Sequence, residues 1–164
     1  MSAINAHQCC VWDNYKYAMY TKFREPKLYR YAARGDWNLI PHRCKTHPKE
    51  ASFVHKYAPM DTALSRMLRT ESCAQCSEEM QQEIFEMKHQ AVVALLDANA
   101  SVASSRDTFQ RTPLHWACMD AAANHGESED SILLLLLDRA PQAVNMTDVE
   151  QRTPPHHLVA RHDR

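Results

Sequence analysis

Glycine is almost absent from this chain. The 164 residues include only two glycines, which effectively excludes a phosphate-binding loop, because such loops need glycine where the backbone approaches the phosphates. The sequence also lacks the G-x-S-x-G motif of serine hydrolases and the H-E-x-x-H motif of zinc metalloproteases. We therefore expect no enzyme activity and no cofactor.

Long apolar segments and targeting signals are missing as well. No run reaches the roughly 18 apolar residues that a membrane span needs. Residues 1–10 contain neither a basic stretch nor an apolar core, which argues against a secretion signal. Six cysteines in a chain without such a signal favour thiols over disulfides. We expect a cytoplasmic or nuclear protein.

The residues that are abundant suffice for one globular domain. Hydrophobic residues make up 45% of the chain, and the formal net charge is −1. One domain is the default for this length. The near-zero charge argues against a dedicated nucleic-acid-binding protein, although a local basic face stays open as an alternative.

One eight-residue motif is the most informative part of the sequence. The letters R-T-P-L-H-W-A-C at 111–118 are echoed by R-T-P-P-H-H-L-V-A at 152–160 and more faintly by D-T-A-L-S-R-M-L at 61–68. Thr112 is suited to cap a helix, and Pro113 suits the first helical position. Leu114, Ala117 and Cys118 would then share one face. Motifs that return at intervals of tens of residues indicate stacked structural units.

This motif resembles the T-P-L-H-x-A signature that opens a helix in the ankyrin repeat. The resemblance implies an all-α fold, an ankyrin-repeat solenoid of helix-turn-helix units with short hairpin loops. In that family the histidine bonds across to the next unit. The residues that inherit structural roles from the motif are Thr112, Pro113, Leu114, His115, Thr153, Pro154 and His156.

The expected units have unequal lengths. We expect an aromatic-rich arm or cap at 1–27 and a repeat domain at 28–164, with units at about 28–56, 57–106, 107–147 and, incomplete, 148–164. Leu28, Leu64, Leu114 and Pro155 are then equivalent and are separated by 36, 50 and 41 residues, against a family period of about 33. We expect the additional residues to lie in 71–86 and 121–130, as insertions between paired helices.

Apolar runs and turn residues predict the rest of each unit. A first helix from Leu28 should end at Gly35, with a second helix starting near Trp37. Further second helices are expected at 87–96 and at 131–137, and the latter is apolar all round and should be buried on several sides.

The turns depart from the family pattern. Asn99 stands where glycine is usual and is expected to tolerate the left-handed backbone, whereas Ala140 and Pro141 imply a different turn. The usual hairpin glycine is replaced by Met60, Gln110 and Gln151, which implies hairpins of altered geometry or a divergent branch of the family.

Two residue pairs have the spacing of metal ligands. Cys73 and Cys76 form a C-x-x-C, while Cys44 and His47 form a C-x-x-H. The repeat arrangement would place the two pairs at opposite ends of a helix, roughly 15 Å apart, which is too far for one zinc ion. Cys73 and Cys76 stay as weak metal candidates that would need other ligands, and a zinc- or redox-responsive scaffold is an alternative function.

The resemblance also places a binding surface on the hairpin tips and the first helices. By position, the partner-binding residues are Arg30, Arg34, Arg66, Arg69, Phe109, Arg111, Trp116, Met119 and Arg152. Acidic residues concentrate instead in the two insertions. We therefore expect a non-catalytic scaffold that binds another, acidic protein on its concave face, anchored by Trp116 and Phe109.

Other interpretations of the same residues stay open. The arginines could form a solvated helix face, and Trp116 could pack against a neighbouring unit. A nucleic-acid-associated regulatory factor would use the same arginines.

Overall fold

The computed structural model describes residues 25–56, 60–69, 77–120 and 131–162, with side chains described as far as Val159. Within these ranges the chain is mainly helical and forms no strand, and its one sheet-like contact there is an isolated bridge between Val54 and Thr62. The expectation of an all-α fold is confirmed for this part of the chain. The arm expected at 1–27 lies outside the described residues apart from Glu25, Pro26 and Lys27.

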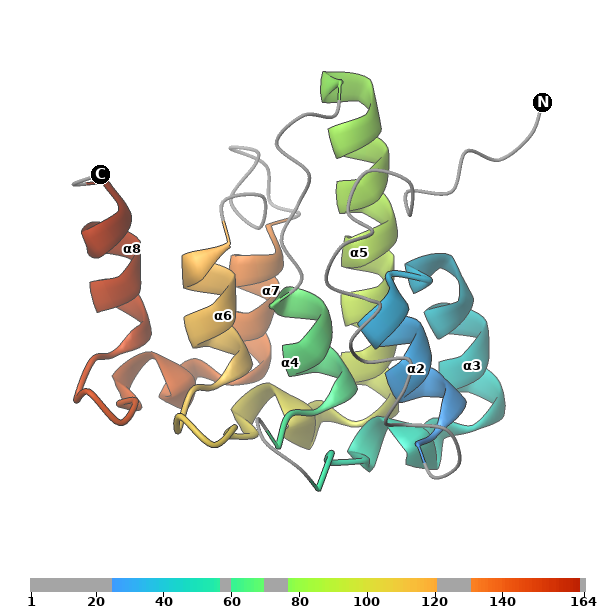
Figure 1. Ribbon diagram of the computed structural model, residues 1–164, viewed down its shortest axis with the longest axis horizontal. Helices are drawn as coiled ribbons and strands as arrows, with labels where there is room; N and C mark the ends of the chain where they lie inside the picture. The colour runs from blue at the N-terminus through green and yellow to red at the C-terminus, as the bar shows by residue number, and fades with distance from the viewer. Residues whose placement is uncertain (1–24, 57–59, 70–76, 121–130, 163–164) are drawn as a thin grey trace.

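The main helices lie in two layers (Figure 1). In the first layer each helix contacts the next along the chain, in the order α2 (Lys27–Arg34), α4 (Ala63–Leu68), α6 (Pro113–Met119) and α8 (Pro154–His162). In the second layer the same holds for α3 (Ile40–Thr46), α5 (Glu78–Ala98) and α7 (Ile132–Arg139). A short 3-10 helix, η2 (Trp37–Leu39), precedes α3.

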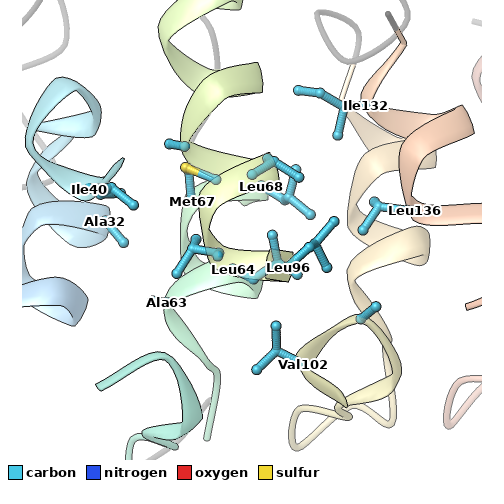
Figure 2. Close-up of a cluster of buried hydrophobic side chains, with 14 of the residues drawn as sticks. Ala32, Ile40, Ala63, Leu64, Met67, Leu68, Leu96, Val102, Ile132 and Leu136 are labelled. Atoms are coloured by element: carbon cyan, nitrogen blue, oxygen red, sulfur yellow. The ribbon is translucent and has the colours of Figure 1, made fainter. Parts of the chain in front are cut away.

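Apolar side chains from both layers fill the space between them. Leu64 and Leu68 of α4 lie near Leu96 of α5, with Ile40 and Ile132 of the second layer further along the same cluster (Figure 2). The expected equivalence of the motif leucines agrees with burial, since Leu28, Leu64 and Leu114 are buried. Pro155 is exposed, so it does not fill the corresponding core position.

The helices of the first layer begin and end as their sequences predict. Thr112 occupies the N-cap position of α6, and Pro113 is its first residue. The Thr62 hydroxyl accepts a hydrogen bond from the Ser65 N–H at 3.3 Å, which caps α4. Gly35 ends α2 with φ 79°, a left-handed conformation that glycine adopts without steric cost.

The helices of the second layer all end in the same way. His47, Asn99 and Ala140 take extended φ values of −140°, −159° and −147°. After each comes a five-residue 3-10 helix: η3 (Pro48–Ser52), η4 (Ala100–Ser104) and η6 (Pro141–Asn145).

Two predictions for these turns are therefore wrong. Asn99 is not left-handed, because its side-chain oxygen instead accepts the Ser101 N–H at 3.1 Å and caps η4. The turn at Ala140 and Pro141 does not differ from the others, because proline suits the first position of η6, where no N–H is needed.

Side-chain hydrogen bonds link these 3-10 helices to one another. The Asn99 amide donates to the Ser52 hydroxyl at 2.8 Å, and the Gln142 amide donates to the Ser104 hydroxyl at 2.9 Å. Since Ser52 ends η3 and Ser104 ends η4, the two bonds join successive turns along one edge of the molecule.

One expectation about the second layer needs correction, and another agrees with the structure. Helix α5 begins at Glu78, after the Ser77 N-cap, so half of the insertion expected at 71–86 is helix. The run at 131–137 is buried on several sides, as expected, since Ile132 and Leu136 are buried and Leu133, Leu135 and Leu137 are partly buried, while Leu134 is 50% exposed. Ile132 and Leu136 are one turn apart and take the buried face of α7, which leaves Leu134 on the other side.

A lysine is buried between the layers. Lys88 of α5 is 1% exposed, and its Nζ lies 2.5 Å from Oδ2 of Asp120, the residue that ends α6. The same Nζ lies 5.5 Å from the centroid of the Trp37 ring. A buried charge is tolerated only when it is paired, so this contact fixes α5 against both η2 and α6.

Replacing Lys88 tests that pair. We expect Lys88→Met to lower the free energy of unfolding by about 3–5 kcal/mol, because the Asp120 carboxylate would lose its buried counter-charge. The double variant Lys88→Met/Asp120→Leu should recover most of the loss. Urea denaturation followed by circular dichroism measures both, and equal stability of Lys88→Met and the wild type would contradict the assignment.

The turns before the first-layer helices contain left-handed residues that are not glycine. Met60, Gln110 and Gln151 have φ values of 54°, 57° and 60°. The backbone thus stays in the region that glycine favours, rather than adopting the altered geometry that the missing glycines suggested.

A glycine substitution in such a turn should be tolerated better than an alanine substitution. Gln151 is exposed, and we expect Gln151→Gly to be more stable than Gln151→Ala by about 1 kcal/mol, because alanine pays the left-handed penalty and glycine does not. Both variants remove the same side chain beyond Cβ, so thermal or urea unfolding of the pair isolates the backbone contribution. The opposite order would show that the turn is not left-handed in solution.

Candidate protein-binding surface

The structure brings the nine candidate binding residues to the first layer. Arg30 and Arg34 belong to α2, Arg66 belongs to α4 and Arg69 follows it directly, and Trp116 and Met119 belong to α6. The turns that precede α6 and α8 supply Phe109, Arg111 and Arg152. Arg34 and Phe109 are exposed, and the other seven are partly buried.

Trp116 lies at the centre of this surface. The guanidinium of Arg69 is 5.6 Å from its ring centroid, and that of Arg111 is 5.1 Å away. The indole N–H donates to Oδ2 of Asp107 at 3.1 Å. Trp116 therefore packs against its neighbours and is only partly available to a partner, whereas Phe109, 5.3 Å from the Arg111 guanidinium, stays 45% exposed.

A buried aspartate organises each of the turns before α6 and α8. Oδ1 of Asp107 accepts the N–H groups of Phe109 and Arg111 at 2.8 and 2.9 Å. In the same way, Oδ1 of Asp148 accepts the N–H groups of Glu150 and Arg152 at 2.8 and 3.0 Å. These bonds hold the left-handed turns without glycine.

The second oxygen of Asp148 faces a histidine and two arginines. It lies 3.0 Å from Nε2 of His157, 3.5 Å from a terminal nitrogen of Arg152 and 3.6 Å from Nε of Arg111. Burial alone would raise the pKa of this carboxyl, but the hydrogen bonds from the Arg152 N–H, His157 and the Glu150 N–H outweigh burial and hold the pKa well below its usual range.

A third buried aspartate, Asp61, lies at the α2 end of the surface. The Tyr29 hydroxyl of α2 donates to Oδ1 of Asp61 at 2.5 Å, and Arg69 lies 3.6 Å from Oδ2. Burial and the adjacent Asp61 raise the pKa of Tyr29, which stays neutral. The Tyr29 ring also stacks on His55 at 5.2 Å, and Nε2 of His55 lies 2.6 Å from Glu25.

These contacts form one chain across the first layer, which we call the polar ladder. It runs from α2 to α8 through Tyr29, Asp61, Arg69, Trp116, Arg111, Asp148 and His157. The ladder places carboxylates among the arginines, so the expected separation of acidic from basic residues does not extend to the turns.

The separation holds only in part among the described helices, because α2 is basic and the first turns of α5 are acidic, whereas α3 of the second layer is itself basic. Among the described residues, neither Arg30 nor Arg34 forms an ion pair with a carboxylate. Figure 1 shows that the N-terminal end of α5 extends past its neighbours. The first half of this second-layer helix carries four exposed acidic residues: Glu78, Glu79, Glu83 and Glu86.

Hydrogen bonds determine which ring nitrogen acts as the acceptor in the two motif histidines. Nδ1 of His115 accepts the Thr112 N–H at 3.0 Å, so the proton of the neutral ring sits on Nε2, which donates to the Arg152 carbonyl at 3.2 Å. The expected bond across to the next turn is thus present. Nδ1 of His156 accepts the Thr153 N–H in the same way, at 3.1 Å.

The metal candidates gain no support from the described part of the chain. Cys73 and Cys76 lie outside it. Cys44 is buried, which raises the pKa of its thiol to about 11, while His47 is exposed at the end of α3. No group of three or more metal-ligating side chains occurs in the ranges the structure describes.

Sequence reasoning missed the three aspartates and His157 as a network. Asp107 and Asp148 each stand five residues before the motif threonine, and that shared spacing was the available signal.

Comparison of the chain with protein-family models, with curated proteins and with solved structures gave no match. No helix in the described ranges has both the length and the apolar character to cross a membrane.

Asp148 and Asp107 offer a matched pair of substitutions. We expect Asp148→Asn to lower the free energy of unfolding by about 3 kcal/mol and Asp107→Asn by about 1 kcal/mol. The reason is that an amide can still accept the two turn N–H groups, but it cannot compensate the cations that surround only Asp148. Equal losses in urea denaturation would mean that the ladder contributes nothing beyond the turn.

Proposed function

We propose that this chain is a non-catalytic protein-recognition module built from ankyrin-like helix pairs. The observation that supports the proposal most directly is the repeated turn and helix start. The segments from Asp107 and from Asp148 make the same aspartate and histidine hydrogen bonds, and His115 of the first reaches Arg152 of the second. Stacked units of this kind leave an extended surface on the first layer.

The charge pattern favours a particular position for an acidic partner. Arg111 and Arg152 already face Asp148 and Glu150, so they offer little uncompensated charge. Arg30 and Arg34 of α2 lie apart from these carboxylates and are the stronger attraction for an acidic segment.

The turn tips favour apolar contacts beside that acidic segment. Met60, Phe109 and Val149 are 45%, 45% and 53% exposed. The Val149 N–H donates to the Phe109 carbonyl at 3.0 Å, which joins two adjacent tips. A partner with acidic residues toward α2 and apolar residues toward these tips would match both features, and exposed aromatic side chains are common interface hot spots.

Charge reversal tests the proposed surface. We expect Arg30→Glu/Arg34→Glu to reduce the proteins captured by the tagged chain from a cell extract by about tenfold or more, because like charges would face the acidic partner. The control variant Lys45→Glu/Lys49→Glu makes the same change of charge at exposed positions of α3 and η3, and it should capture the same proteins as the wild type.

The outcomes separate the alternatives. Circular dichroism first establishes that both variants are folded. Equal capture by all three proteins would contradict recognition through α2. Capture that nuclease treatment abolishes, and that falls steeply with added salt, would indicate a nucleic-acid partner instead.

A further inference from the structure

Helix α8 stands at one end of the first layer and α2 at the other (Figure 1). Pro113 opens α6 and Pro154 opens α8, so each residue of α6 has its counterpart in α8 41 positions later. The described residues include no further helix of this layer beyond α8. Helix α6 thus shows how such a helix is covered when a neighbour follows it, and α8 shows the same kind of helix without one.

The side of α8 that faces away from α6 repeats the side of α6 that faces α8. His115 is fully buried against the α8 unit, whereas its counterpart His156 is exposed. Cys118, on the same face of α6, is 4% exposed, and its counterpart Val159 is 63% exposed. Pro155, one turn before Val159, is exposed as well. Helix α8 therefore presents apolar surface at positions that are buried in α6.

Two hydrogen-bonding groups at this end lack the partners that their counterparts have. Nε2 of His115 donates to the Arg152 carbonyl, and the Phe109 carbonyl accepts the Val149 N–H. The neutral His156 ring carries its proton on Nε2, because its Nδ1 accepts a backbone N–H. Within the described ranges, neither this ring N–H nor the Val149 carbonyl has a hydrogen-bond partner. One donor and one acceptor are therefore available on the same face.

The same end carries charges of both signs. The side chains of Glu150 and Arg152 are 56% and 37% exposed and lie 2.7 Å apart. A face with a donor, an acceptor, an acid and a base can be complementary to itself across a two-fold axis. The α2 end of another copy is a poorer match for Arg152, because α2 carries Lys27, Arg30 and Arg34 and no acidic residue.

We propose that α8 is a dimerisation element, against which α8 of a second copy of this chain packs across a two-fold axis. His156 and Val149 both lie at the N-terminal end of α8, so they meet across the axis only if the two helices run parallel. Each His156 N–H then donates to the Val149 carbonyl of the other copy. Pro155 and Val159 of both copies form the apolar centre of the contact.

The size of the contact predicts a weak dimer. Helix α8 has nine residues and is about 14 Å long, whereas a stable dimer buries about 800 Å² on each partner. Association should therefore be reversible and depend on protein concentration. A dimer joined at α8 leaves α2 of each copy at the far end of its layer, so the inference does not depend on the proposed function.

Sedimentation equilibrium of the intact chain tests the dimer. We expect the average mass to rise from monomer toward dimer between about 10 µM and about 1 mM, and to stop there because a two-fold contact closes on itself. Val159→Lys should raise the dissociation constant about tenfold or more, because the axis would place two lysines side by side. Leu134→Lys makes the same kind of change on α7, where Leu134 is 50% exposed, and should dimerise like the wild type.

A second variant and the size of the assembly keep the outcomes distinct. Val149 is 53% exposed, and Val149→Lys should weaken the dimer in the same direction as Val159→Lys. Circular dichroism first establishes that the variants are folded. A wild type that stays monomeric over the whole range would overturn the inference, as would dimerisation of both variants at wild-type strength. Growth beyond the dimer, or loss of the dimer in Leu134→Lys, would place the contact elsewhere and would also overturn it.

Discussion

The first layer depends on burying polar groups that each have one satisfactory set of partners. Asp148 is the clearest case, because one oxygen binds two backbone N–H groups of its turn while the other faces His157 and two arginines. Such a carboxylate would be costly to bury alone. The turn, the helix that follows and the preceding turn therefore have to form together, and this couples neighbouring parts of the layer.

The helices of the first layer are too short to be stable in isolation. Helices α4 and α6 have six and seven residues, whereas an isolated helix needs about 12–15 residues to be even marginally stable in water. Their stability must come from packing of Leu64, Leu68 and Leu114 between the layers and from the capped starts at Thr62 and Thr112. The linked 3-10 helices at the other edge supply a second, hydrogen-bonded connection.

Much of the helical layout could be predicted because local rules decide it. Threonine followed by proline determines the start of α6, and Gly35 ends α2, as expected from capping and backbone preference. Asn99 could not be predicted in the same way, because its side chain has a competing use as a cap and a donor to Ser52, and this outweighs its tolerance for the left-handed region. The start of α5 was placed too late because its exposed acidic first turns lack the apolar periodicity that marks a buried helix.

The sequence could predict where the candidate surface lies, but not which of its charges are already compensated within the fold. Their positions in the repeat motif predicted that Arg69, Arg111 and Trp116 lie on one surface, and in the structure both arginines contact the Trp116 ring. What the pattern could not show is that Asp61 and Asp148 approach the same arginines from other turns, since those contacts span the spaces between units.

An arginine that the sequence suggests is free to bind a partner can already be paired with a carboxylate inside the fold. Desolvated pairs of this kind contribute more to fixing one arrangement than to attracting a partner. Under the proposed function, recognition by charge would be left to α2, and the turn arginines, which contact Trp116 and Phe109, would hold these two rings in position for apolar contacts.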